Sequence, residues 1–294
     1  MSKTTRRDVA AEITAQLVAK LDQGVAPWVR PWAIPMPRNH ATGRAYRGAN
    51  VVLLWAAMDA RGYRDARWLT FKQALDCDGH VRRGEKGTQI VFWRFTEIEK
   101  QDATTGETRK VTIPFARFHT VFNVEQCDGL NASAGLDAEP ATLGAEVLAT
   151  RAGVSVSFGG TRAFYAPDSD RIQIPAREHF ASGDAFEAML LHELVHWTGH
   201  EHRLARDLRH RFSSEAYAFE ELVAELGSAF LCAHLGITGR LQHAEYLASW
   251  ARVLRDDKHA IFTAARLAQE ATAYLLGADS DASEKDDAGE AQAA

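Results

Sequence analysis

Residues 188–202, Ala-Met-Leu-Leu-His-Glu-Leu-Val-His-Trp-Thr-Gly-His-Glu-His, hold the pattern that decides the fold of this chain. His192 and His196 stand four residues apart and Glu193 follows the first histidine, which makes an H-E-x-x-H motif. On a helix, residues four apart share one face, so both imidazoles can reach one metal ion. Glu193 then lies beside the open coordination position, where it can take a proton from water. We therefore predict a metal site with His192 and His196 as ligands and Glu193 as the catalytic residue.

The flanks of the motif predict a buried helix. Apolar residues before and after it give the helix one strongly apolar side, and Gly199 is a natural end. Burying two histidines and a glutamate costs desolvation free energy, which a bound metal offsets. The polar residues that follow, including Arg203 and Arg206, are interpreted as the polar end of this helix rather than as part of a cleft.

Two patterns compete for the third metal ligand. Residues 192–202 fit H-E-x-x-H-x-x-G-x-x-H, which resembles the metzincin peptidases and would make His202 the ligand. Metzincins also have a methionine turn downstream, whereas Met189 is the last methionine here. Glu221 and Glu225, four apart on a later predicted helix, are similar to the gluzincin arrangement, in which the first acid binds zinc and the second holds a ligand histidine. We predict Glu221 as the ligand and Glu225 as the residue behind it. There are two alternatives for the third ligand: Glu225, with the roles of the two acids exchanged, and His202.

Composition and charge divide the chain in two. Of the 294 residues, 46% are hydrophobic and 25% charged, which is typical of soluble globular proteins. Residues 1–130 carry 20 Lys and Arg against 14 Asp and Glu, a net charge of +6, whereas residues 131–294 carry 14 against 25, a net charge of −11. The basic part suggests a nucleic-acid partner. The three cysteines suit a reducing cytosol, and the sequence has no apolar run of membrane-spanning or signal-peptide type, so we expect a cytoplasmic protein without a membrane partner.

The periodicity of the sequence predicts an α+β fold with two domains. We expect an α+β DNA-binding domain at residues 1–128, a metallopeptidase domain of a small sheet plus helices at 142–276, and a disordered acidic tail at 277–294. The order of elements in the second domain resembles the zincin metallopeptidases. Helices are expected, besides the motif helix, at 5–23, 50–61, 71–76 (capped by Thr70), 142–151, 214–235, 240–256 and 258–276. Strands are expected at 89–95, 111–113, 115–124, 154–158, 163–165 and 171–174, with a hairpin tip at 102–107.

Aromatic and basic residues of the first domain predict contacts with single-stranded DNA. Aromatic rings beside cations suit sequence-tolerant binding of single strands, because every base has a face that stacks. Trp55 and Trp93 lie in apolar runs and are assigned to the core. The stacking candidates lie in loops and are Trp28, Trp32 and Tyr46. The candidate phosphate contacts are Arg38, Arg44, Arg47, Arg82, Arg83 and Lys86.

Several motifs together resemble the ArdC-type antirestriction proteins, whose N-terminal module also occurs in plasmid-encoded primases. In the first domain they are Asn39-x-x-Thr42-Gly43-Arg44-x-Tyr46-Arg47-Gly48-x-Asn50, Trp68-Leu69-Thr70-Phe71-Lys72-Gln73-Ala74, Gly84-Glu85-Lys86-Gly87 and Phe122-Asn123-Val124. In the second they are His192 to Gly199, Arg203-Leu204 and the segment Glu220–Glu225. The resemblance implies a single-stranded-DNA-binding domain fused to a zincin-like metallopeptidase domain, carried on conjugative plasmids, that shields incoming DNA from restriction.

Three functions follow as hypotheses. The chain protects single-stranded DNA that enters a recipient cell, with double-stranded DNA as an additional partner to consider. Alternatively, it coats DNA and its metal only stabilises the fold, or it is a DNA-targeted metalloprotease that cleaves a bound protein such as a restriction component. Zinc is the expected metal, and manganese, iron or cobalt also suit a His/His/Glu set. The retained Glu193 favours an enzyme, because a structural site needs no general base.

Overall fold

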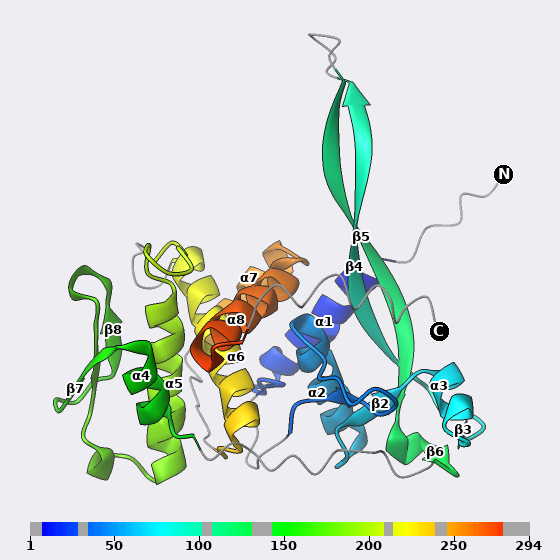
Figure 1. The fold of residues 1–294 in the computed structure, drawn as a ribbon, viewed down its shortest axis with the longest axis horizontal. Helices are drawn as coiled ribbons and strands as arrows, with labels where there is room; N and C mark the ends of the chain where they lie inside the picture. The colour runs from blue at the N-terminus through cyan, green and yellow to red at the C-terminus, as the bar shows by residue number, and fades with distance from the viewer. Residues whose placement is uncertain are drawn as a thin grey trace.

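The computed structural model describes residues 8–28, 35–101, 108–130, 143–208, 214–238 and 246–278 (Figure 1). We call residues 8–130 the N-terminal half and residues 143–278 the C-terminal half. Both combine helices with small sheets, which confirms the predicted α+β, two-part architecture.

The N-terminal half is built on a sheet with strand order β1-β2-β5-β4. The first pair is parallel and the others are antiparallel. The paired strands β4 and β5 form a long hairpin that projects away from the body of the molecule (Figure 1). The elements are α1 (Val9–Asp22), β1 (Arg38–Asn39), α2 (Ala49–Arg61), β2 (Arg67–Leu69), α3 (Phe71–Asp76), β3 (His80–Val81), β4 (Thr88–Gln101), β5 (Thr108–Asn123) and β6 (Cys127–Asp128).

The C-terminal half places helices beside a three-stranded sheet of order β7-β9-β8. Strand β9 is the centre, parallel to β7 and antiparallel to β8, so β8 is an edge strand beside the motif helix α5. The elements are α4 (Ala145–Ala152), β7 (Ser155–Phe158), β8 (Phe164–Ala166), β9 (Arg171–Ile174), α5 (Gly183–Thr198), α6 (Glu215–Leu235), α7 (Leu247–Asp256) and α8 (Ala260–Leu276).

One hydrophobic core runs through both halves. Helix α1 packs on α7 and α2 packs on α8, so helices far apart in the sequence lie side by side. Ring contacts cross the same boundary: Trp28 meets Trp250 with centroids 5.8 Å apart, and Trp55 meets Phe230 at 5.8 Å. The two halves therefore share one hydrophobic core instead of forming two separate cores.

A glycine allows the two helices of the motif site to approach closely. At Gly227 of α6, a Cβ atom would lie 2.8 Å from a methyl carbon of Val195 on α5, which is too close for any larger residue without a shift. The hydroxyl of Ser228 donates to the carbonyl of Ala188 across the same interface, at 3.0 Å. These contacts bring α6 close enough to α5 for its acidic side chains to reach the two histidines.

Most predicted elements lie within a few residues of the observed ones. Thr70 caps α3 as expected, in a full capping box with Gln73. The predicted strands 111–113 and 115–124 are one continuous strand, β5, because Pro114 lies opposite Phe95 without ending the pairing. The expected helix over 240–256 is observed as α7 from Leu247, and residues 239–245 lie outside the described residues. The predicted hairpin tip at 102–107, the acidic tail from 279 and part of the domain boundary also lie outside them.

Candidate metal centre

Helix α5 places the two histidines of the motif side by side. Ser182 caps the helix through a hydrogen bond to the N–H of Ala185, and the following turns bury the apolar face that carries the motif. The Nε2 atoms of His192 and His196 are 3.2 Å apart, and the two rings meet edge to face. Both imidazoles therefore present the same nitrogen to one point.

Helix α6 brings a carboxylate to that point. The oxygens of Glu221 lie 3.4 Å from Nε2 of His192 and 3.5 Å from Nε2 of His196. One ligand atom from each of the three residues lies within 4.8 Å of the others. Two imidazole nitrogens and one carboxylate oxygen are a donor set that suits a divalent cation, and three protein ligands leave a position open for reaction.

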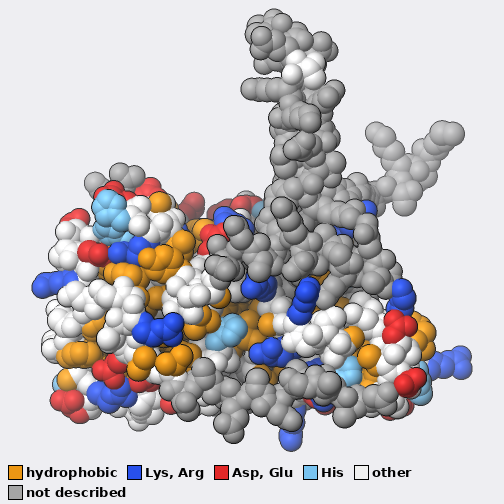
Figure 2. All heavy atoms as spheres, viewed as in Figure 1, with side chains coloured by type: hydrophobic (Ala, Val, Ile, Leu, Met, Phe, Trp, Pro, Cys, Tyr) orange, Lys and Arg blue, Asp and Glu red, His pale blue; other side chains and the backbone are white. Residues whose placement is uncertain are grey.

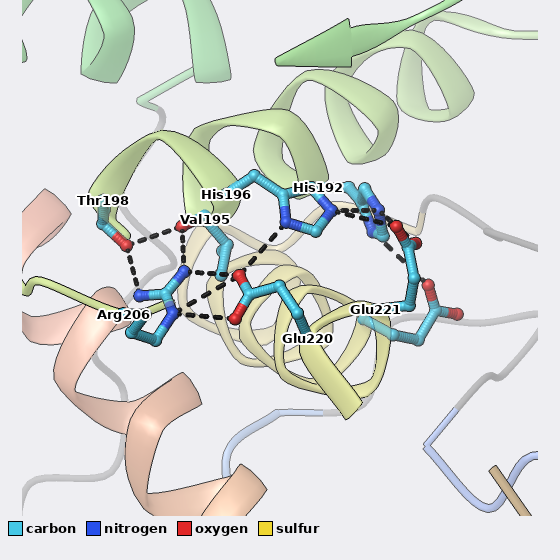
Figure 3. Close-up of polar contacts among 8 residues, drawn as sticks. His192, Val195, His196, Thr198, Arg206, Glu220 and Glu221 are labelled. Carbon is cyan, nitrogen blue, oxygen red and sulfur yellow. Dashed lines mark hydrogen bonds and ion pairs between the residues drawn. The ribbon is translucent and has the colours of Figure 1, made fainter. Parts of the chain in front are cut away.

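Two further carboxylates lie beside the other nitrogens of the histidines. Nδ1 of His192 lies 3.6 Å from a carboxylate oxygen of Glu225, the residue proposed from the sequence to lie behind a ligand histidine. Nδ1 of His196 lies 3.2 Å from Glu220 (Figure 3). A carboxylate at Nδ1 fixes the tautomer that leaves the Nε2 lone pair for a metal. Each histidine thus has an acid beside its second nitrogen. One of them, Glu225, is predicted from the sequence, whereas Glu220 is not.

Arg206 anchors Glu220 from the loop after α5 (Figure 3). Its guanidinium donates to both oxygens of Glu220, at 2.9 and 3.1 Å, and to the carbonyl of Val195 and the hydroxyl of Thr198. Only 5% of the Arg206 side chain is exposed. Burial alone would raise the pKa of Glu220, but the contacts with His196 and Arg206 lower it below its usual value. Arg206 is therefore part of the site and not merely a polar helix end.

The same contacts set the protonation of the two histidines. Burial would lower the pKa of His192, but Glu221 and Glu225 outweigh it and raise that pKa to about 10. Glu220 and Glu221 likewise raise the pKa of His196 to about 9 against the effect of burial. Burial opposes the ionised form of Glu221, but the two imidazoles hold its pKa far below the usual value. The acids thus create a strong preference for positive charge at this point, which a divalent cation satisfies.

Glu193 lies on the wall of a cavity beside the three converging residues. The cavity has a volume of about 380 Å³ and is lined by His192, Glu193, His196 and Glu221, by Tyr165 of β8, and by Tyr217. Glu193 is 5% exposed, and its carboxylate lies beside the main chain of Tyr165. Burial raises its pKa, which makes its carboxylate a better proton acceptor than an exposed one.

His202 lies apart from the converging atoms. Its side chain is 79% exposed and pairs with Glu201 at 3.5 Å. In the described parts of the chain, the group of residues placed to share a metal is His192, His196 and Glu221. The metzincin alternative therefore has no geometric support.

Comparison with known proteins identifies the family of this chain. Residues 7–122 match the family described as the N-terminal domain of anti-restriction factor ArdC, and residues 144–267 match the family described as zincin-like metallopeptidase. The crystal structure of the antirestriction protein ArdC from plasmid R388 is 40% identical, with a TM-score of 0.76, and the match covers 92% of this chain and 97% of that chain. The chain belongs to the ArdC family.

Relatives of this ArdC-family chain have different names and lengths. The uncharacterized protein y4eC of Sinorhizobium fredii is 41% identical over an alignment of 257 residues, which covers 85% of this chain and 84% of the relative. A DNA primase TraC of Escherichia coli is 42% identical over an alignment of 260 residues, which covers 82% of this chain but only 24% of TraC. R388 ArdC was also solved with Mn(II) bound, and that structure is 38% identical, with a TM-score of 0.76 and coverage of 92% and 98%. One member of the family thus binds a divalent metal.

In this ArdC-family chain, two aromatic residues predicted to stack on bases are buried. Trp28 is 4% exposed and packs against Trp250, and Tyr46 is 9% exposed with its hydroxyl 3.5 Å from the amide of Asn39. The expectation that these two rings offer exposed stacking faces is wrong, because tertiary contacts cover rings that local sequence places in loops. Trp32 lies outside the described residues.

The basic residues predicted to contact phosphates fall into three groups. Arg82 is 42% exposed and is occupied by protein partners: it donates to the carbonyl of Glu125 at 2.5 Å and forms ion pairs with Glu85 and Asp128, which brace the turn before β4. The side chains of three others are exposed, and two lie partly buried beside the turn that precedes α2. The exposed residues are Arg44, Arg83 and Lys86, and the partly buried ones are Arg38 and Arg47.

None of the helices in the described parts of this ArdC-family chain combines the length and apolar character needed to cross a bilayer.

Proposed function

We propose that the chain is a plasmid-encoded antirestriction protein that binds single-stranded DNA in the cytoplasm of a recipient cell and protects it from restriction. We further propose that His192, His196 and Glu221 bind a divalent metal, and that the site hydrolyses amide bonds of polypeptides. The observation that carries the second statement is the convergence of two Nε2 atoms and one carboxylate at one point, beside the buried Glu193 and an open cavity.

The chain's own residues supply most of the proposed chemistry. A bound divalent cation acts as a Lewis acid that polarises the scissile carbonyl and makes water more acidic. Glu193 takes the proton of the attacking water and returns it to the leaving amine, as general base and then general acid. Glu225 and Glu220 hold His192 and His196 in the tautomer that binds metal.

The DNA-binding part of the proposal rests on family and charge. The N-terminal half matches the N-terminal domain of ArdC, and the stretch of TraC that aligns with this chain belongs to a DNA primase. Arg44, Arg83 and Lys86 expose cationic side chains on this half. Phosphate contacts of this kind make affinity fall with salt, so binding of a labelled oligothymidylate should weaken steeply as salt is raised.

The test of the enzymatic part is Glu193→Gln, which removes the base and keeps the shape and the three proposed ligands. Loss of a general base slows hydrolysis by about 10²–10⁴-fold. Conjugation into a restricting recipient should then give as few transconjugants as a plasmid without this gene, while metal content and oligonucleotide binding remain as in the wild type. Glu201→Gln is the matched control, since that carboxylate is 79% exposed and lies nine residues from His192.

The result opposed to the proposal is full protection by Glu193→Gln. Protection would then come from DNA coating alone, with a metal that stabilises the fold. A loss of protection in both Glu193→Gln and Glu201→Gln would also count against a specific role for Glu193.

A further inference from the structure

Two tyrosine hydroxyls face each other on the wall of the metal-site cavity. Tyr217 lies on α6 one turn before Glu221, and Tyr246 immediately precedes α7. Their hydroxyl oxygens are 3.3 Å apart, and both side chains line the cavity that holds Glu193. Neither tyrosine has a role in the function proposed above.

The hydrogen bonds of this pair have one direction. Tyr217 and Glu221 stand four residues apart on one face of α6 and line the same cavity, which places the hydroxyl of Tyr217 beside the carboxylate of Glu221. An ionised carboxylate only accepts hydrogen bonds and a hydroxyl carries one proton, so Tyr217 donates to Glu221 and must accept from Tyr246. The chain of donors therefore runs from Tyr246 through Tyr217 to the carboxylate that faces both histidines.

An aromatic stack supports Tyr246 from behind. Its ring lies nearly parallel to that of Trp250, with centroids 5.9 Å apart and planes 23° from parallel. Trp250 in turn contacts Trp28 of the N-terminal half. Both indoles are almost completely buried, at 1% and 4% exposure. Because buried rings in a close-packed core move little, the position of Tyr246 depends on a residue of the N-terminal half.

We propose that Tyr217 and Tyr246 are positioning residues that orient Glu221 for metal binding, and that the contact of Trp250 with Trp28 makes the N-terminal half a support of the metal centre. The inference rests on the proposed metal site and adds to it residues outside the H-E-x-x-H motif. Without the donor at Tyr217, the carboxylate is free to turn away from the histidines. Groups that orient a metal ligand in this way change metal affinity by about 10–100-fold.

The first test measures the affinity of the full chain for Mn²⁺ alone, by calorimetry after treatment with a chelator. Tyr217→Phe should weaken binding by about tenfold or more, and Tyr246→Phe should weaken it by a smaller factor. Because Tyr246 acts only through Tyr217, the double variant should bind Mn²⁺ like Tyr217→Phe. Tyr274→Phe is the matched control, since this tyrosine of α8 packs on Trp197 away from the cavity and should leave the affinity unchanged.

The second test addresses the support from the N-terminal half. Trp28→Leu should weaken Mn²⁺ binding in the wild-type background and have no effect in the Tyr217→Phe background. Trp28→Phe, which keeps an aromatic ring against Trp250, should have a smaller effect and replaces the leucine variant if that variant fails to fold.

Three results would overturn the inference. The first is wild-type Mn²⁺ affinity in Tyr217→Phe. The second is additive losses in the double tyrosine variant, which would mean that Tyr246 acts on its own. The third is unchanged affinity in a Trp28 variant that folds, which would remove the support from the N-terminal half. A wild-type chain that binds no Mn²⁺ would instead overturn the proposed metal site itself, so the two failures are distinguishable.

Discussion

Replacing Arg206 by methionine should destabilise the chain far more than the loss of an ordinary surface arginine. Its side chain is 5% exposed and pairs with the carboxylate of Glu220, whose side chain is 11% exposed. Methionine removes the cation and leaves the carboxylate buried, with His196 as its remaining partner among the residues that the structure describes. Removing one member of a buried ion pair costs about 3–5 kcal/mol, and the carbonyl of Val195 also loses a donor. We expect a loss of about 4 kcal/mol in the free energy of unfolding, within that range.

The assay is urea unfolding near neutral pH in the presence of a chelator, followed by tryptophan fluorescence. Arg255→Met is the matched control, because Arg255 also pairs with a carboxylate, Asp22, but the two side chains are 52% and 49% exposed. An exposed pair contributes less than about 1 kcal/mol. The double variant Arg206→Met with Glu220→Leu should recover much of the loss, since it removes the stranded charge.

A loss in Arg206→Met no larger than that in Arg255→Met would refute this reasoning. It would show that water reaches Glu220 and that the pair is not buried in solution. A double variant as unstable as Arg206→Met would show that packing, and not the stranded carboxylate, accounts for the loss.

Three further outcomes follow from the site. Mn²⁺ at about one hundred times its Kd should stabilise the chain by about 2.7 kcal/mol in thermal unfolding, and His192→Ala should abolish the gain. Because the pKa values of His192 and His196 are raised to about 10 and about 9, the metal must displace their protons, so Mn²⁺ affinity should fall as pH is lowered and calorimetry in different buffers should detect proton release. The hydrogen bond from Arg203 lowers the pKa of Asp170, so this contact stabilises the chain above the ordinary pKa of an aspartate and is lost as pH falls. Asp170→Asn should therefore lower the free energy of unfolding by less than about 1 kcal/mol at neutral pH, because the Asp170 side chain is 42% exposed. Urea unfolding in acid should show no difference between this variant and the wild type.

The sequence was most informative where chemistry depends on local spacing. His192 and His196 meet because residues four apart share a helix face, and Thr70 caps α3 because its hydroxyl reaches an N–H three residues on. Glu221 and Glu225 could be placed relative to each other by the same rule. Their assignment to particular ring nitrogens required the packing of α6 on α5, which Gly227 permits and which no local pattern specifies.

The missed residues act across long stretches of sequence. Arg206 reaches Glu220 from a loop fourteen residues earlier, and Tyr246 reaches Tyr217 from twenty-nine residues later. A signal for Glu220 was present, since two ligand histidines each need a partner for the second nitrogen and only one acid had been assigned. The exposure of Trp28 was also misjudged because of a distant contact. Its local sequence indicates a loop, but Trp250, far away in the sequence, packs against its ring.

A core that both halves share also ties their inheritance together. A recombination event between residues 130 and 143 would leave Trp28 and Trp55 without the rings of Trp250 and Phe230. The recombinant proteins would expose apolar surface that the other half normally covers, and selection against aggregation would remove the genes that encode them. The stretch shared with TraC is 260 residues long, enough to span both halves, although it makes up only 24% of that primase. We therefore expect the two halves to be gained, fused to longer proteins and lost as a single heritable unit.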